Sequence, residues 1–267
     1  MPGFSTGASP FGQEEMSLPA RLLGVFLSPR RSFAAVAGRE SAHDWLLPAL
    51  LACLVGLAAH QLTVDLVTDL ERPEVRQHLE GLGQAERERY EQGMQVVQEK
   101  GWMMVPVGVF SSLVVVGALL LLFTRSLFSK EVTYRQMLVV KGYASMVMIP
   151  EWIVRTALMR ATDNPEVHTS PAALLSEAAS RSFAGRVLAG MNLFDLWQVV
   201  VMGVGIATLA GARLRRVLLG LLILWGVWVF GGAALERSGP PGGPAGGPAP
   251  AETPAPAPAG PPPDQGL

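Results

Sequence analysis

The residues of this chain that could do chemistry are charged and polar side chains inside apolar segments. Three of them lie in the apolar stretch 136–159, namely Lys141, Glu151 and Arg155. At about 100° per residue these three fall within an arc of about 120°, so a helix here has one hydrophilic face. A second apolar stretch, 187–210, contains Asn192, Asp195 and Gln198. Ionisable side chains inside a membrane indicate either a conduction path or a paired network.

We predict that Glu151, Arg155, Asp195 and Asn192 meet as one intramembrane polar cluster. If the two stretches run antiparallel, Glu151 and Asp195 lie at the same depth, and Arg155 lies about one turn away. Arg155 would then pair with both carboxylates, which lowers the free energy needed to bury all three charges. Lys141 lies about 20 Å from Arg155 along the axis. We therefore expect Lys141 to extend to the headgroups at the membrane surface.

Residues for enzymatic or metal chemistry have no recognisable spacing. The sequence has four histidines and contains no HExxH, GxSxG, GxGxxG or P-loop pattern. Cys53 is the single cysteine, which excludes an intrachain disulfide and a cysteine metal cluster. A net charge of −1 does not indicate nucleic-acid binding. We expect a protein that is not an enzyme and has no catalytic, metal or cofactor-binding residues.

Five apolar segments must position the polar cluster, and each is long enough to cross a hydrocarbon layer of about 30 Å. They are 46–66, 102–124, 136–159, 187–210 and 217–235. Only 16% of the residues are charged, and mean hydropathy is +0.32. Pro150 lies inside the third segment and should kink it or free a backbone carbonyl. The predicted fold class is all-α, a polytopic integral membrane protein with five transmembrane helices in domain 45–236.

The regions on either side of this domain differ from it in composition. The N-terminus, 1–17, and the Pro/Ala/Gly-rich tail, 237–267, cannot bury a core, so we expect both to be disordered. Segment 18–44 fits two short amphipathic helices, the second beginning at Pro29. Because its arginines stand beside large apolar residues, we expect this segment to lie in the membrane interface with its arginines among the headgroups.

Basic residues in the short connections indicate the orientation. Those residues are Arg125, Lys130 and Arg135 between the second and third segments, and Arg213, Arg215 and Arg216 between the fourth and fifth. The positive-inside rule places these connections and the N-terminus in the cytoplasm and the C-terminus on the opposite side. In a bacterium the membrane would be the cytoplasmic (inner) membrane.

The acidic connection 67–101 then lies on the side opposite the N-terminus. Its pattern predicts a helix from Gln84 to Lys100, with Arg87 and Glu91 one turn apart. Such a run of charge is more typical of a solvated face than of a binding site.

Three parts of the sequence resemble the Yip family, the Ypt-interacting-protein membrane domain. They are FLSPRRSFAAV at 26–36, KGYASMVMIPEWI at 141–153, and SPAALLS from Ser170 followed by NLFDLWQ from Asn192. Their order and spacing hold over about 18–235. The residues of this chain that match positions of the family pattern are Pro29, Phe33, Tyr143, Pro150, Asn192, Phe194 and Trp197. The resemblance implies a five-helix membrane protein with a cytosolic N-terminus. Eukaryotic members are associated with Rab-type GTPases, but this chain has only a short N-terminal segment, so small GTPase binding is not transferred.

The sequence favours a non-enzymatic, Yip-like membrane scaffold or partner-binding protein. Its partners are the lipid bilayer and either other membrane proteins or a homo-oligomer, without cofactor or nucleic acid. The small residues Gly203, Ala207 and Gly211 favour helix packing within the chain over packing between chains. The alternative is a small transporter or channel subunit that uses the Glu/Arg/Asp cluster.

Overall fold

The computed structural model describes residues 16–37, 41–128, 131–165, 167, 169–175, 179 and 182–235. All of their regular elements are helices. These are α1 (Leu18–Leu27), α2 (Pro29–Val36), α3 (His43–Val67), α4 (Pro73–Glu80), α5 (Gln84–Lys100), η1 (Gly101–Met103), α6 (Met104–Phe128), α7 (Tyr134–Ser145), α8 (Met148–Thr162), η2 (Pro171–Leu174), α10 (Phe183–Gly190), α11 (Leu193–Leu209) and α12 (Leu214–Leu235). The predicted terminal segments lie outside the described residues, apart from residues 16 and 17.

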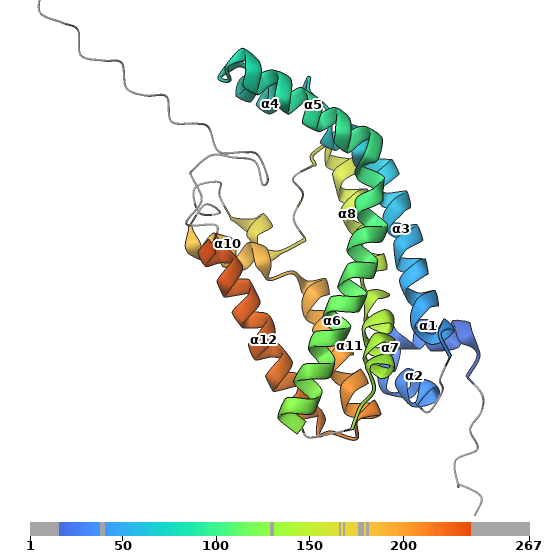
Figure 1. The fold of residues 1–267 in the computed structure, drawn as a ribbon. Helices are drawn as coiled ribbons and strands as arrows, with labels where there is room; N and C mark the ends of the chain where they lie inside the picture. Colours follow the sequence, from blue (N-terminus) through green and yellow to red (C-terminus); the bar gives the residue numbers. More distant parts are fainter. Residues whose placement is uncertain are drawn as a thin grey trace, which may run out of the picture.

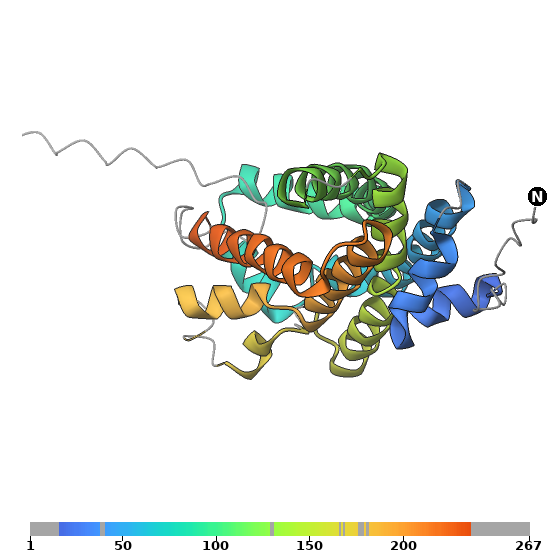
Figure 2. The ribbon, with the colours of Figure 1, turned by 90° about the horizontal axis from the view of Figure 1, so that it is seen from below.

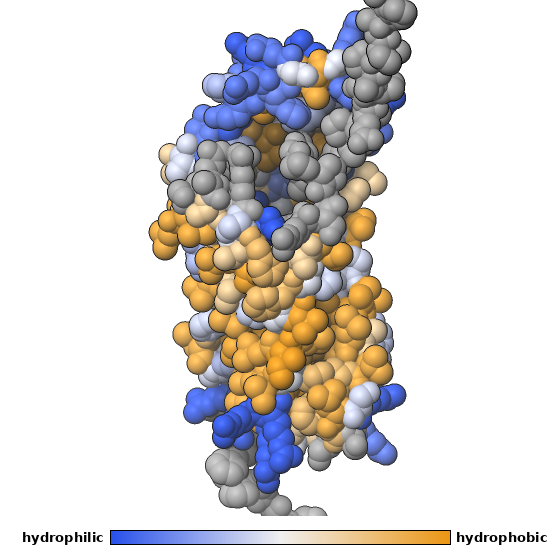
Figure 3. Space-filling view, turned by 90° about the vertical axis from the view of Figure 1, so that its left-hand side faces the viewer, coloured by the Kyte–Doolittle hydropathy of each residue, from blue (hydrophilic) through white to orange (hydrophobic). Residues whose placement is uncertain are grey.

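An elongated helical bundle forms the membrane part of the molecule (Figure 1). Four helical runs are long and apolar enough to cross a membrane, and they are His43–Val67, Gln84–Phe128, Tyr134–Thr162 and Leu214–Leu235. The bent pair α10 and α11 makes a fifth crossing if it is counted as one span. On the face drawn in Figure 3 an apolar band crosses the bundle, with hydrophilic residues beyond it at both ends. The described residues therefore confirm the all-α polytopic membrane fold.

The N-terminal helices α1 and α2 pack against the lower end of the bundle as drawn in Figure 1. Phe33 is completely buried, and its ring lies 5.8 Å from that of Tyr143 on α7. Arg21 does not extend to the headgroups as expected. It is buried and forms an ion pair at 2.9 Å with Asp44, which lies in the first turn of α3. This segment is thus integrated into the bundle by both apolar and ionic contacts.

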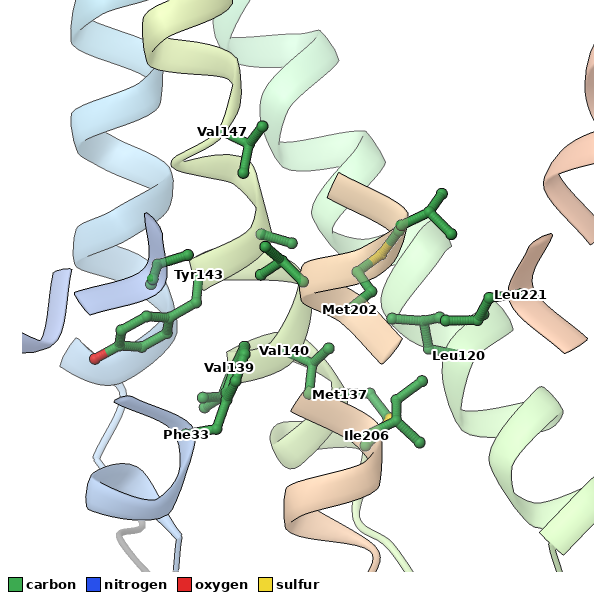
Figure 4. Packing of buried hydrophobic residues seen from close by; sticks show 14 of the residues in the cluster. Phe33, Leu120, Met137, Val139, Val140, Tyr143, Val147, Met202, Ile206 and Leu221 are labelled. Carbon is green, nitrogen blue, oxygen red and sulfur yellow. The ribbon is translucent and has the colours of Figure 1, made fainter. Parts of the chain in front are cut away.

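The main apolar core lies where α2, α7, α11 and α12 meet beside α6 (Figure 4). In lipid the packing of helices depends on close van der Waals contact, so small residues matter at the crossings. A Cβ at Gly142 would lie 2.7 Å from the backbone oxygen of Trp45, and one at Gly205 would lie 2.9 Å from the Phe33 ring. Gly203 faces Leu218 of α12. Of the small residues Gly203, Ala207 and Gly211, Gly203 therefore packs against a helix of the same chain.

A break divides the third predicted span into α7 and α8. Pro150 has no N–H to donate to the carbonyl of Met146, and its ring would clash with that carbonyl in a straight helix. The backbone tightens instead, since the N–H groups of Met146, Val147 and Ile149 each bond to the carbonyl three residues earlier at 3.1 Å. The interruption predicted from Pro150 is confirmed, and it lies one turn before the proline.

The fourth predicted span, 187–210, is not one continuous helix. Its first residues belong to α10, which meets α11 at a bend of 52° (Figure 1). Asn192 causes the break, because its side-chain oxygen accepts a hydrogen bond from the N–H of Phe194 at 3.0 Å and so starts a new helix. The single membrane helix that we expected over 187–210 is corrected to two helices. Asn192 is the N-cap of α11, and Asp195 and Gln198 lie in its first two turns.

An arm built from α4 and α5 extends beyond the apolar band at the upper end of Figure 1. The helix predicted from Gln84 to Lys100 is confirmed with those bounds as α5. The expected pair of Arg87 with Glu91 is also present, at 3.1 Å. The arm leads through η1 into α6, so that Gln84–Phe128 forms one helical run of 45 residues.

Candidate functional site

The polar residues of α11 lie beside the break between α7 and α8. Gln198 bonds to α7 with both ends of its amide. Its Oε1 accepts a hydrogen bond from Lys141 Nζ at 3.0 Å, and its Nε2 donates to the backbone oxygen of Ala144 at 3.3 Å. Carbonyls at a helix end lack the usual partner four residues on. Gln198 therefore binds both the buried lysine and the backbone of the interrupted helix.

Lys141 does not extend to the headgroups as we expected from its position. Only 3% of its surface is exposed, and it lies inside the bundle on α7. A buried ammonium group is tolerated in a membrane only if polar groups surround it. Gln198 supplies one acceptor, and the carboxylate of Asp195 attracts Lys141 electrostatically. The cation of this site is therefore Lys141.

Asn192 joins the two broken spans a few residues away from Gln198. Its Oδ1 caps α11, while its Nδ2 donates a hydrogen bond to Oε1 of Glu151 on α8. Glu151 is partly buried in the first turn of α8. The structure thus brings together Glu151 and Asn192, two of the four residues of the predicted cluster, through a direct contact.

Asp195 lies on the first turn of α11 and is exposed. We expected it to turn towards other helices. No hydrogen bond from its side chain is found among the described residues, although it repels Glu151 and is attracted by Lys141. An exposed carboxylate within an apolar helix is unfavourable in lipid and more typical of a wet cavity.

Arg155 does not lie between the two carboxylates. It is exposed on α8, and in the described part of the chain no ion pair joins it to Glu151 or Asp195. It attracts Glu151 one turn earlier on the same helix, but not closely enough for an ion pair. The prediction failed because sequence spacing gives depth along a helix and leaves open how the helix is rotated about its axis.

Comparison with known proteins identifies the family of this chain. The family model described as "Yip1 domain" matches residues 23–235, which is most of the chain. The chain belongs to the Yip1 domain family. The match runs from within α1 to the end of α12 and includes the whole polar cluster. A comparison with curated proteins finds no match, and neither does one with solved structures.

The motif positions of this Yip1 domain are mostly architectural. Pro29 begins α2, and both Phe33 and Tyr143 are completely buried. Pro150 and Asn192 interrupt the two spans that carry the cluster, as described above. Phe194 is partly buried against the main core, whereas 45% of Trp197 is exposed. These residues shape the site and supply little chemistry of their own, apart from the side chain of Asn192.

Among the polar contacts of the Yip1 domain that were missed from the sequence, two involve buried charged side chains. The first is the bond between Lys141 and Gln198, two residues that stood on the hydrophilic faces of their spans. The second is the ion pair of Arg21 with Asp44. An acidic residue at the N-terminal end of a long apolar helix was the one sign of it in the sequence. In the described part of the chain no group of three His, Cys, Asp or Glu side chains could hold a metal ion. The arrangement can stabilise broken helices and can present a carboxylate.

Proposed function

We propose that this Yip1 domain protein is a non-enzymatic membrane scaffold that binds a partner protein through the α4–α5 arm. The observation that carries the proposal is the exposure of α5, in which no residue is buried. A mostly polar helix without buried residues gains stability from i,i+4 pairs of its own side chains. Those pairs are Gln84 with Glu88, Arg87 with Glu91, and Gln95 with Glu99.

The arm is a preformed surface. Leu79 of α4 is buried, and the rings of His78 and Tyr90 lie 5.7 Å apart, so α4 packs onto α5. Val96 and Val97 are exposed apolar residues on the same helix. A surface that is ordered before binding loses less conformational entropy when a partner binds. These features favour recognition of a protein by the arm outside the apolar band.

The non-enzymatic part of the proposal is supported by the polar cluster. Lys141 is bonded to Gln198, and Asn192 is bonded both to Glu151 and to its own helix. These groups are engaged in holding two interrupted helices together. Membership of the Yip1 family, a family of non-enzymatic membrane proteins, is consistent with that role.

The test is site-specific photo-crosslinking in native membranes. A photoreactive residue at Gln92 on the exposed arm should capture a protein, whereas one at Leu119, exposed on the apolar part of α6, should capture lipid. The substitution Val96→Asp should abolish the protein adduct from Gln92 without changing thermal stability. A pattern in which Gln92 captures no protein, or in which Val96→Asp leaves capture unchanged, would contradict the scaffold proposal.

We further propose that the lower end of the bundle faces the cytoplasm. It carries exposed arginines in α2 and at the start of α12, which are Arg30, Arg31, Arg213, Arg215 and Arg216. Basic residues in short connections favour the cytoplasmic side. With a membrane-impermeant thiol reagent on intact cells, Gln92→Cys should be labelled and Arg213→Cys should not. The reverse labelling pattern would overturn this orientation.

A small transporter or channel subunit is the second candidate function, and the exposed Asp195 favours it. Two interrupted helices face each other at this residue, and transport sites are often built where spans are discontinuous. In proteoliposomes, a proton or sodium flux through the wild-type protein that is lost in Asp195→Asn would support transport. The matched control is Glu74→Gln, which alters an exposed carboxylate on the arm. A flux that is absent, or equal in both variants, would reject this candidate.

A further inference from the structure

An open groove of about 570 Å³ lies at the lower end of the bundle, where α2 meets the connection between α11 and α12. Figure 2 views the molecule from this end. The lining includes Arg30 and Ala34 of α2, Ala207 and Thr208 of α11, and Leu214 at the start of α12. One wall therefore carries a guanidinium group, and the others are small or apolar. None of these residues belongs to the polar cluster described above.

Several small side chains and the left-handed Gly211 line this groove. Gly211 has φ +60° and ends α11 with a left-handed residue, and a Cβ there would have no atom within 4 Å. The opposite wall is anchored because Phe33 of α2 is buried against Gly205 of α11. The hollow is thus a consequence of how α2 is packed, and no side chain of the described residues fills it.

The described residues of α2, of the α11–α12 connection and of the start of α12 carry positive charge and no acid. Among the described residues no acid forms an ion pair with Arg30. The sequence contains no Asp or Glu between Asp195 and Glu236, while Arg213, Arg215 and Arg216 are exposed just beyond the groove. A guanidinium group binds phosphate through paired N–H donors. The groove therefore fits a ligand that carries an anionic phosphate.

The position of the groove indicates that its ligand also has an apolar part. Thr208 lies in the last turn of α11 and Leu214 begins α12, so the groove lies at the end of two membrane helices. At this depth the headgroup region meets the hydrocarbon layer. Val204 and Ala207 line the part nearer the bundle interior. A ligand that fits all of these features has a negative head and an apolar tail.

We propose that this groove binds one anionic phospholipid of the surrounding membrane, with its phosphate on Arg30 and an acyl chain along Val204, Ala207 and Leu214. A soluble phosphate would use Arg30 but leave the apolar wall unoccupied. This proposal is independent of the scaffold function, since it concerns the opposite end of the molecule from the α4–α5 arm.

The test uses the full chain in vesicles of phosphatidylcholine and phosphatidylglycerol at nine to one. A trace of phosphatidylglycerol with a photoreactive acyl chain is activated, and adducts are mapped by mass spectrometry to the peptides of α2 and the α11–α12 connection. Arg30→Gln should lower the adduct yield about tenfold, because it removes a charge-assisted hydrogen bond to the phosphate. Arg31→Gln is the matched control, because Arg31 is exposed on the same helix and does not line the groove.

Two further measurements complete the test. Ala34→Trp should fill the groove and suppress these adducts without lowering the unfolding temperature, since Ala34 is exposed. Excess inorganic phosphate should not reduce the yield. Equal losses in Arg30→Gln and Arg31→Gln would assign the effect to a diffuse basic surface and overturn the proposal. Competition by phosphate, or equal labelling by a photoreactive phosphatidylcholine, would also overturn it.

Discussion

The Nζ of Lys141 donates a hydrogen bond to Oε1 of Gln198 at 3.0 Å, and this bond joins α7 to α11 inside the membrane part of the bundle. The two residues are 57 positions apart in the chain. Because Gln198 also bonds to the backbone of Ala144, it links the lysine and the broken helix at one point. The stability of the cluster should depend on this amide more than on Arg155.

Gln198→Leu should destabilise the protein by about 2 kcal/mol, because it leaves a buried ammonium group without this acceptor. Unfolding of the purified full chain in mixed detergent micelles measures the change. Replacing both partners, in Lys141→Met with Gln198→Leu, should restore most of the loss, since two apolar groups need no hydrogen bond. The control is Gln61→Leu on the exposed face of α3, which should not lower stability. A double variant less stable than Gln198→Leu alone would contradict this account.

Asn192→Ala should destabilise by about 2 kcal/mol through two separable losses, the cap of α11 and the bond to Glu151. Asn192→Ser separates them, because serine also caps helices but is too short to keep the same bond to Glu151. We expect about half of the alanine effect in the serine variant, measured by the same unfolding assay. Equal effects of serine and alanine would show that the cap contributes nothing.

Arg155→Gln and Asp195→Asn should have additive effects on stability, within about 0.5 kcal/mol, because the two side chains do not pair. Lys141→Met and Asp195→Asn should instead be coupled by more than that, since Lys141 attracts this carboxylate. Two double-mutant cycles in the same detergent measure both quantities. Coupling of Asp195 to Arg155 and not to Lys141 would restore the arrangement first expected from the sequence.

Gly142→Ala should destabilise by about 1 to 3 kcal/mol, because the new methyl group meets the backbone of Trp45, which cannot rotate away. Gly108→Ala on α6 is the matched control, since a Cβ there has no atom within 4 Å. That variant should be neutral or more stable by up to about 1 kcal/mol, the difference in helix propensity. Thermal unfolding of both variants compares them, and equal destabilisation would refute close packing at Gly142.

Local features were predictable from the sequence because they depend on neighbouring residues. The apolar segments, the interruption near Pro150 and the bounds of α5 follow from hydropathy, from the missing proline N–H and from helix signals within a few positions. The pair of Arg87 with Glu91 needed only the spacing of one turn. The polar faces of the third and fourth spans were likewise visible as periodic patterns.

Only the tertiary structure decided which of these polar residues meet. Lys141 could reach the headgroups or the interior, and the rotation of α7 against α11 directs it to Gln198. Arg155 has the right depth but an exposed position on α8. Asn192 interrupts a segment whose apolar composition favours one helix, because its side chain competes for the backbone N–H of Phe194. The composition and periodicity of one segment determine how deep each polar residue lies in the membrane and on which face of its helix. Which polar residues pair depends on how separate helices are rotated and packed against one another. Because that packing involves parts of the chain that are far apart in sequence, it could not be read from any one segment.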